Sequence, residues 1–175
     1  MEDHRSPEFA AAVGDLSVVP ETRMRPQPLI SVRNVEVSSR WYQRLLGCQS
    51  AHGGAEYERL VDSGRLVLQL HKWGVEHHHG PIGDPTDKPY GNGVLLWFEM
   101  DDFDAAMVRV KELGAQIVLP RHRNPPDGHG GPNHWECWLL DPDGYTVVLA
   151  SPDGTADGDW SPSSSMNATD SMKTM

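Results

Sequence analysis

Hydrophobic residues alternate with polar ones, or run in short β-branched and aromatic stretches, at several places between positions 28 and 150. Such short patterns, bounded by Gly, Pro, Asn or Asp, predict strands. The predicted strands span residues 28–32, 57–61, 66–71, 94–100, 116–119, 135–140 and 145–150. The last two flank Asp141-Pro142-Asp143-Gly144, which has the composition of a type I turn, so we expect them to form a hairpin.

Two other segments have the periodicity of a helix. Their apolar stripes are Val37, Trp41 and Leu45 in the first segment, and Phe103, Met107, Val110 and Leu113 in the second. We expect Ser38 or Ser39 to cap the first helix and Gly47 to end it. The pair Asp101-Asp102 should open the second helix, because negative charge complements the helix dipole there, and Gly114 should end it.

The same order of elements occurs twice. Val32-Arg33-Asn34-Val35 matches Met100-Asp101-Asp102-Phe103 at an offset of 68, and Leu46-Gly47 matches Leu113-Gly114 at an offset of 67. The chain therefore reads as two copies of strand, helix and three strands. We place one α+β domain at 26–151, with modules at about 27–73 and 93–151, between disordered tails at 1–25 and 152–175. Because Met24 directly precedes the domain, both Met1 and Met24 stay open as the translation start.

The charge balance, the cysteine content and the lack of long apolar runs exclude several functional classes. Acidic residues outnumber basic ones 25 to 15, and the net charge of -10 opposes binding to nucleic acid. Cys48 and Cys137 are the two cysteines and form no CxxC motif, which excludes a disulfide scaffold and a cysteine-rich zinc site. No apolar run approaches the roughly 20 residues of a membrane span, and the N-terminus lacks the pattern of a secretory signal. We expect a cytoplasmic protein that binds neither membrane nor nucleic acid.

Residues around the two predicted helices match a known pattern. They are Val32-Arg33-Asn34-Val35, Ser38, Trp41-Tyr42 and Leu45-Leu46-Gly47 in the first half, and Phe98 to Phe103 and Asp141 to Tyr145 in the second. In these motifs the chain resembles the vicinal oxygen chelate superfamily, also called the glyoxalase/bleomycin resistance/dioxygenase superfamily, over residues 27 to 151. The resemblance implies a glyoxalase-like domain in which two βαβββ modules form a curled mixed sheet around a cavity. Members often pair modules between chains, so it also implies a homodimer.

The resemblance further implies where metal-using members place their ligands. The corresponding positions here hold Gln27, Gln69, Leu95 and Val148. Leu and Val cannot ligate a metal, and a Gln amide is a poor ligand for a divalent transition metal without a carboxylate or imidazole beside it. We therefore expect no usual catalytic metal, and neither a glyoxalase I nor an extradiol dioxygenase of the usual kind.

Strand alternation predicts which other side chains face the cavity. Because Cys137 and Leu139 are the natural core pair of their strand, His134, Glu136 and Trp138 should point the other way. The candidate ligand-binding residues are Gln27, Gln69, His71, Trp97, Glu99, His134, Glu136 and Trp138. One interpretation is a polar and aromatic cavity that binds a small molecule. The other is a displaced divalent metal site formed by His71, His134 and Glu136.

Two loops carry further polar candidates. His77-His78-His79 is typical of a solvated loop tip, although one of these residues beside His71 would suit a lid. Arg121, His122, Arg123 and His129 form a basic group that either balances surface charge or receives an anionic substrate group. Neither loop decides the function.

Three functions remain open from the sequence. The first is a small-molecule-binding protein of the bleomycin-resistance type with no cofactor. The second is a metal-dependent lyase, isomerase or dioxygenase-like enzyme that uses the displaced site. The third is a structural or regulatory partner protein, which would need an exposed apolar patch.

Overall fold

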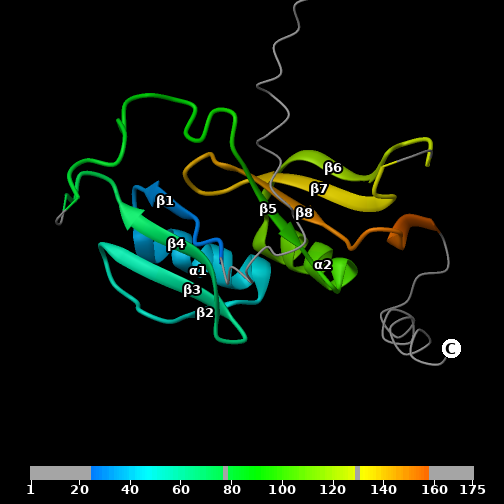
Figure 1. Ribbon diagram of the computed structural model, residues 1–175, viewed down its shortest axis with the longest axis horizontal. Coiled ribbons are helices and arrows are strands. Elements are labelled where there is room, and N and C mark those ends of the chain that lie inside the picture. Colours follow the sequence, from blue (N-terminus) through cyan, green and yellow to red (C-terminus); the bar gives the residue numbers. More distant parts are fainter. Residues whose placement is uncertain (1–24, 77–78, 129–130, 158–175) are drawn as a thin grey trace, which may run out of the picture.

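The chain forms two successive modules that lie side by side (Figure 1). The computed structural model describes residues 25–76, 79–128 and 131–157. Both tails lie largely outside the described residues, and so do positions 77–78 and 129–130 with their histidines. In the described part, no helix has the length and apolar character needed to cross a membrane.

Each module follows the order strand, helix and three strands. The first contains β1 (Leu29–Val32), α1 (Val35–Leu46), β2 (Gln49–Ser50), β3 (Tyr57–Asp62) and β4 (Arg65–Lys72). The second contains β5 (Leu95–Glu99), α2 (Phe103–Leu113), β6 (Gln116–Asn124), β7 (His134–Leu140) and β8 (Thr146–Ala150), followed by a 3-10 turn at Thr155–Asp157. The α+β class and the two βαβββ modules are therefore confirmed.

Each module has its own four-stranded sheet. Sheet A has the order β1-β4-β3-β2, and sheet B has the equivalent order β5-β8-β7-β6. The pairs β1/β4 and β5/β8 are parallel, and the other neighbours are antiparallel. One face of each sheet packs on the module's helix, while the opposite face is what we call the open face.

The helices end where the sequence predicts, but α1 begins earlier than expected. Gly47 and Gly114 both adopt the left-handed conformation that favours glycine, with φ of 76° and 63°. Asp102 caps α2 as expected. For α1 the serine cap was wrong, because Asn34 is the N-cap and its side-chain oxygen accepts from the Val37 N–H at 3.0 Å.

The predicted stripe of α1 was also partly wrong. Val37 is 43% exposed, while the buried side of the helix includes Ser38 and Ser39. Their hydroxyls donate to the carboxylates of Asp143 and Glu58, at 3.2 and 3.0 Å. Because these carboxylates satisfy their hydroxyls, the two serines can be buried inside the helix instead of capping it.

Sheet B differs from the prediction at one edge. β6 runs to Asn124, whereas the sequence predicts a loop from position 120 onward. Pairing with β7 continues to the partners Asn124 and His134. Register shifts between Ile117 and His122 disturb the alternation that would have revealed this extension. The extension brings two more polar side chains to the open face.

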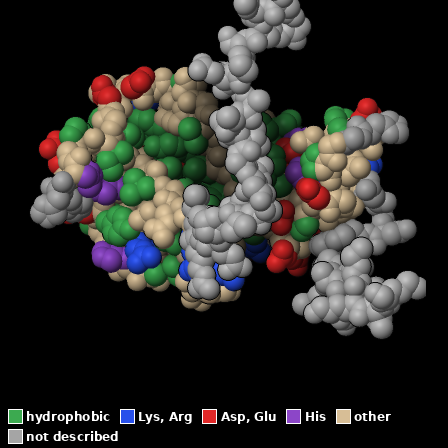
Figure 2. Space-filling model, viewed as in Figure 1, with side chains coloured by type: hydrophobic (Ala, Val, Ile, Leu, Met, Phe, Trp, Pro, Cys, Tyr) green, Lys and Arg blue, Asp and Glu red, His purple; other side chains and the backbone are tan. Residues whose placement is uncertain are grey.

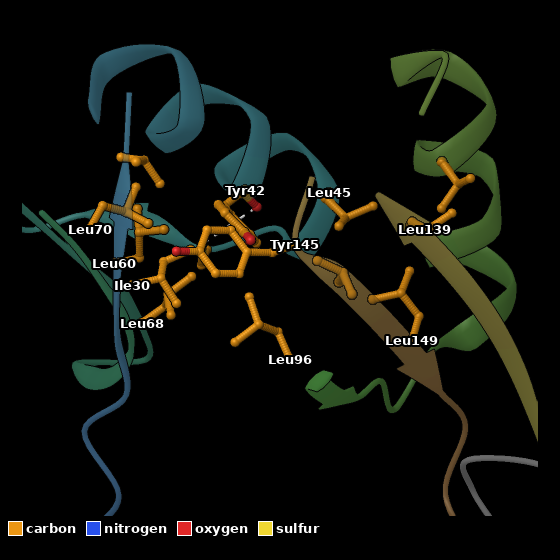
Figure 3. Packing of buried hydrophobic residues seen from close by; sticks show 14 of the residues in the cluster. Ile30, Tyr42, Leu45, Leu60, Leu68, Leu70, Leu96, Leu139, Tyr145 and Leu149 are labelled. Atoms are coloured by element: carbon orange, nitrogen blue, oxygen red, sulfur yellow. Dashed lines mark hydrogen bonds between the residues drawn. The ribbon is translucent and has the colours of Figure 1, made fainter. Parts of the chain in front are cut away.

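The modules are joined through their helices and a shared hydrophobic core. The Arg109 Nε of α2 donates to the Leu45 carbonyl at 2.8 Å, and the Arg44 Nη2 of α1 donates to the Glu112 carbonyl at 3.4 Å. Each arginine thus satisfies a carbonyl in the last turn of the other helix. Tyr42 and Tyr145 lie between the modules in the middle of the shared core (Figure 3).

Candidate functional site

The open face of sheet B carries most of the predicted site. Leu96 and Phe98 of β5 pack on the core, so Leu95, Trp97 and Glu99 point to the open face, where they are exposed. The register places Trp97 beside Val148 and Glu99 beside Ala150. On β7, Cys137 and Leu139 belong to the core, and His134, Glu136 and Trp138 share the opposite face, as the alternation predicts.

Glu136 is the centre of a polar cluster on this face. Its carboxylate is almost fully buried, with 1% of the residue exposed. Oε1 lies 2.8 Å from the His134 Nε2 and also accepts from the Asn124 amide. Oε2 accepts from the Trp138 indole N–H at 2.8 Å and lies 3.5 Å from the His122 Nε2. Both oxygens are therefore enclosed by donors from β6 and β7.

This environment fixes the charge of Glu136. Burial raises the pKa of the carboxyl, but hydrogen bonds from Asn124, Trp138 and His134 outweigh burial and hold the pKa below its ordinary value. The group is ionised at neutral pH and engaged on both oxygens. It therefore suits the orientation of the Trp138 and His134 rings better than the transfer of a proton.

His134 links the cluster to the end of the domain. Its Nδ1 lies 3.2 Å from a carboxylate oxygen of Asp153, on the side of the ring opposite Glu136. The Trp97 ring lies 6.0 Å from the His134 ring, measured between centroids. The imidazole is thus held between two carboxylates, with one tryptophan beside it.

Three members of this cluster were not predicted from the sequence as part of the site, namely Asn124, Asp153 and His122, which was expected in a basic loop. Asn124 and His122 belong to the part of β6 that was predicted as a loop, and continued alternation from β7 across the sheet would have found them. Asp153 lies beyond the last strand, and no pattern in the sequence indicates its contact with His134.

The open face of sheet A carries the other predicted residues. The side chain of Gln69 donates to the Gln27 carbonyl at 3.1 Å and accepts a short hydrogen bond from the Tyr57 hydroxyl. His71 is nearly buried, with Nδ1 2.9 Å from the Lys72 carbonyl and Nε2 3.3 Å from the His79 Nε2. Gln69 and His71 thus belong to a region separate from the Glu136 cluster.

The structure divides the predicted metal ligands between the two sheets. His71 lies on β4, while His134 and Glu136 lie on β7. Among the residues that the structure describes, no group of three His, Cys, Asp or Glu side chains is arranged to hold a metal ion.

The positions that the family resemblance assigns to metal ligands also lack suitable donor atoms. Leu95 and Val148 have no donor atom, and the Gln69 amide is already engaged with Gln27 and Tyr57. These residues do not fit a divalent metal.

A small recess connects the two modules. Its volume is about 240 Å³, and its lining includes Trp97 and Glu99 from sheet B and Cys48 and Val67 from the first module. Burial raises the pKa of the Cys48 thiol to about 11, so the group stays protonated at neutral pH and is a poor nucleophile. The recess therefore offers space beside Trp97, but its cysteine is not suited to nucleophilic chemistry.

The paired modules, with open faces that carry aromatic and polar side chains, define a protein of the glyoxalase-like class. Residues 25–149 match the Glyoxalase/Bleomycin resistance protein/Dioxygenase superfamily, and the chain belongs to this superfamily. The resemblance seen in the sequence is thereby confirmed. No curated protein matches the chain.

Solved structures show the same fold at low sequence identity. A glyoxalase/bleomycin resistance protein/dioxygenase from Alicyclobacillus acidocaldarius is 17% identical, with coverage of 74% of this chain and 92% of that one and a TM-score of 0.51. A lactoylglutathione lyase from Agrobacterium tumefaciens is 12% identical, with coverage of 81% and 100% and a TM-score of 0.55. A bleomycin resistance determinant encoded on the transposon Tn5 is 18% identical, with coverage of 74% and 98% and a TM-score of 0.51.

Proposed function

We propose that the protein binds a small aromatic molecule on the open face of sheet B and uses no metal there. The observation that carries the proposal is an aromatic wall of Trp97 and Trp138, which lie on either side of the buried Val148, with the exposed Leu95 on the same face. Leu95 and Val148 place apolar side chains at two family ligand positions. Flat aromatic surfaces of this kind suit flat or apolar ligands. The Glu136 cluster supplies a fixed polar end.

Apolar and polar side chains lie on the same face of sheet B, which supports a ligand that contacts both kinds of group. Trp97 is 45% exposed, and its ring lies 6.0 Å from the His134 ring, measured between centroids. The Trp138 ring is oriented by its hydrogen bond to Glu136. A preformed wall of this kind loses little conformational entropy on binding. This arrangement supports a binding function of the bleomycin-resistance type. The proposal names the natural ligand by its chemical class, a small aromatic molecule.

The test uses Nile red, a neutral aromatic dye. Wild-type protein should bind it with quenching of tryptophan fluorescence, and Trp97→Ala should weaken binding about tenfold, because one exposed aromatic contact is lost. Val108→Ala is the matched control, since Val108 is 55% exposed but belongs to α2 rather than to the open face. Titration of all three proteins measures the dissociation constants. Equal weakening in both variants, or no binding by the wild type, would refute the proposed site.

We also propose that two copies pair across their open faces. The sheets of one chain are joined at α1 and α2, which leaves the exposed side chains of Leu29, Leu95 and Leu119 without a covering layer in the described part of the chain. Exposed apolar side chains that share one face favour association. Pairing would also enclose the ligand between modules of different copies.

Light scattering after gel filtration tests the dimer. We expect a mass of twice 19.4 kDa for the wild type. Leu95→Arg should raise the dimer dissociation constant by about thirtyfold or more, because a charge would be buried in the interface. Val108→Arg should leave the mass unchanged. A wild-type mass of one chain at micromolar concentration would contradict the proposal.

A further inference from the structure

A second pocket lies on the first module, away from the Glu136 cluster. Its volume is about 510 Å³, and its lining includes Arg25, Arg59, Arg65, Gln27 and Leu66. Arg25 and Gln27 precede β1, Arg59 lies on β3 and Arg65 begins β4. Figure 2 shows Lys and Arg side chains near the end of this module at which β3 and β4 are joined. Residues from three separate segments therefore converge on one pocket.

An irregularity in β4 shapes the pocket floor. Leu60 of β3 pairs with Leu68 of β4, but the next residue, Val61, pairs with Leu66. Val67 therefore has no partner on β3 and is the extra residue of a β-bulge. Leu60 and Leu68 belong to the core. The bulge turns Leu66 to the open face, which gives the pocket an apolar floor beneath its charged rim.

Within the described part of the chain, the three guanidinium groups lie outside every ion pair. In the described residues, no carboxylate forms an ion pair with Arg25, Arg59 or Arg65. Other arginines do pair, since Arg33 binds Asp143 at 2.7 Å and Arg121 binds Asp104 at 2.6 Å. In a chain of net charge -10, carboxylates are plentiful. Three positive charges around one pocket repel one another, and an anion bound between them would relieve that repulsion.

We propose that Arg25, Arg59 and Arg65 bind a small oxyanion with two or more negative charges, for which phosphate is the simplest example. A guanidinium binds phosphate or carboxylate oxygens through two parallel hydrogen bonds, and the amide of Gln27 adds a donor. The pocket has the size of a small-molecule site, whereas the net charge opposes a polyanion such as nucleic acid.

Isothermal titration of the full chain with inorganic pyrophosphate at low ionic strength tests the site. The wild type should bind one pyrophosphate, and Arg59→Gln and Arg65→Gln should each weaken binding about tenfold or more, because each removes a charged hydrogen-bond donor. Arg40→Gln is the matched control: Arg40 is an exposed residue of α1, and the variant loses the same charge. Its affinity should stay within about twofold of the wild type.

Two results would overturn the inference. One is the absence of pyrophosphate binding by the wild type, and the other is equal weakening by Arg59→Gln and Arg40→Gln. Nile red titration of the same proteins separates this failure from failure of the proposed function, because Arg59→Gln should leave dye binding unchanged. An unaltered thermal midpoint for Arg59→Gln shows that any loss of pyrophosphate binding comes from the site and not from unfolding.

Discussion

Replacing Asp141 with alanine lowers the free energy of unfolding by about 3–5 kcal/mol, the expected cost of removing one partner from a buried charged network. Its Oδ1 accepts from the backbone N–H groups of Asp143, Gly144 and Tyr145, at 2.9, 2.8 and 2.9 Å. Its Oδ2 accepts from the Tyr42 hydroxyl at 2.8 Å. Alanine leaves these donors without an acceptor inside the protein. Urea unfolding followed by circular dichroism measures the loss.

The same contacts join the two modules, which explains why the effect should be large. Tyr42 comes from α1 and Asp141 from the turn after β7, and both are buried. Beside them, the Tyr145 hydroxyl donates to the Ser31 carbonyl at 2.9 Å, and Arg33 pairs with Asp143. Loss of the turn geometry therefore loosens the contact between modules as well as the hairpin itself.

Two variants make this prediction specific. Asp141→Asn keeps an oxygen for the three backbone donors and should retain most of the stability. Asp84→Ala removes an exposed aspartate that also accepts a hydrogen bond in a turn, from the Thr86 N–H, and should change stability little. A loss below about 1 kcal/mol for Asp141→Ala would contradict the structural role assigned to this turn.

The two modules could be predicted from the sequence because the residues that indicate their helices and strands are local and occur twice. The offset of 67 to 68 residues reappears in the bounds of α1 and α2, and the glycines that end both helices need no tertiary partner. The two-residue strand β2 was missed, since Gln49–Ser50 is too short to show any period. Asn34 was missed as a cap because the apolar stripe was assigned from Val37 instead of the buried Val35.

The candidate site was less accessible to sequence reasoning. Alternation correctly assigned His134, Glu136 and Trp138 to one face, because β7 is regular and its core pair is obvious. Which faces of different sheets meet depends on packing between modules, so the sequence grouped His71 with residues of sheet B. The arginine pocket escaped notice because its members are spread over three segments and share no motif.

Glu136→Ala should cost about 3 kcal/mol in the free energy of unfolding and also weaken Nile red binding, because buried donors on the open face lose their shared acceptor. The Trp138 indole N–H, the His134 Nε2 and the Asn124 amide all lie against this carboxylate. Without it, the tryptophan ring is no longer held in place. Urea unfolding and dye titration together separate the structural effect from the effect on binding.

The dependence on pH gives an independent test with a definite sign. Burial raises the pKa of Glu136, but its hydrogen bonds hold the folded-state pKa below the ordinary value. The carboxylate therefore contributes stability above the ordinary glutamate pKa of about 4.3. This contribution is lost as the pH falls through the folded-state pKa. The stability difference between wild type and Glu136→Gln should thus be largest near pH 7 and shrink in acid.

Glu99→Gln is the matched control for Glu136→Gln, because Glu99 lies on the same open face but is exposed. It should change neither stability nor its dependence on pH. A difference between wild type and Glu136→Gln that stays constant from pH 7 to pH 3 would contradict an ionised, hydrogen-bonded carboxylate.

Elemental analysis tests the alternative function, a metal-dependent enzyme. Stoichiometric iron, manganese, nickel or zinc that survives replacement of His77, His78 and His79 by Ser, but is lost in Glu136→Ala, would replace the metal-free binding site with a metal centre on sheet B.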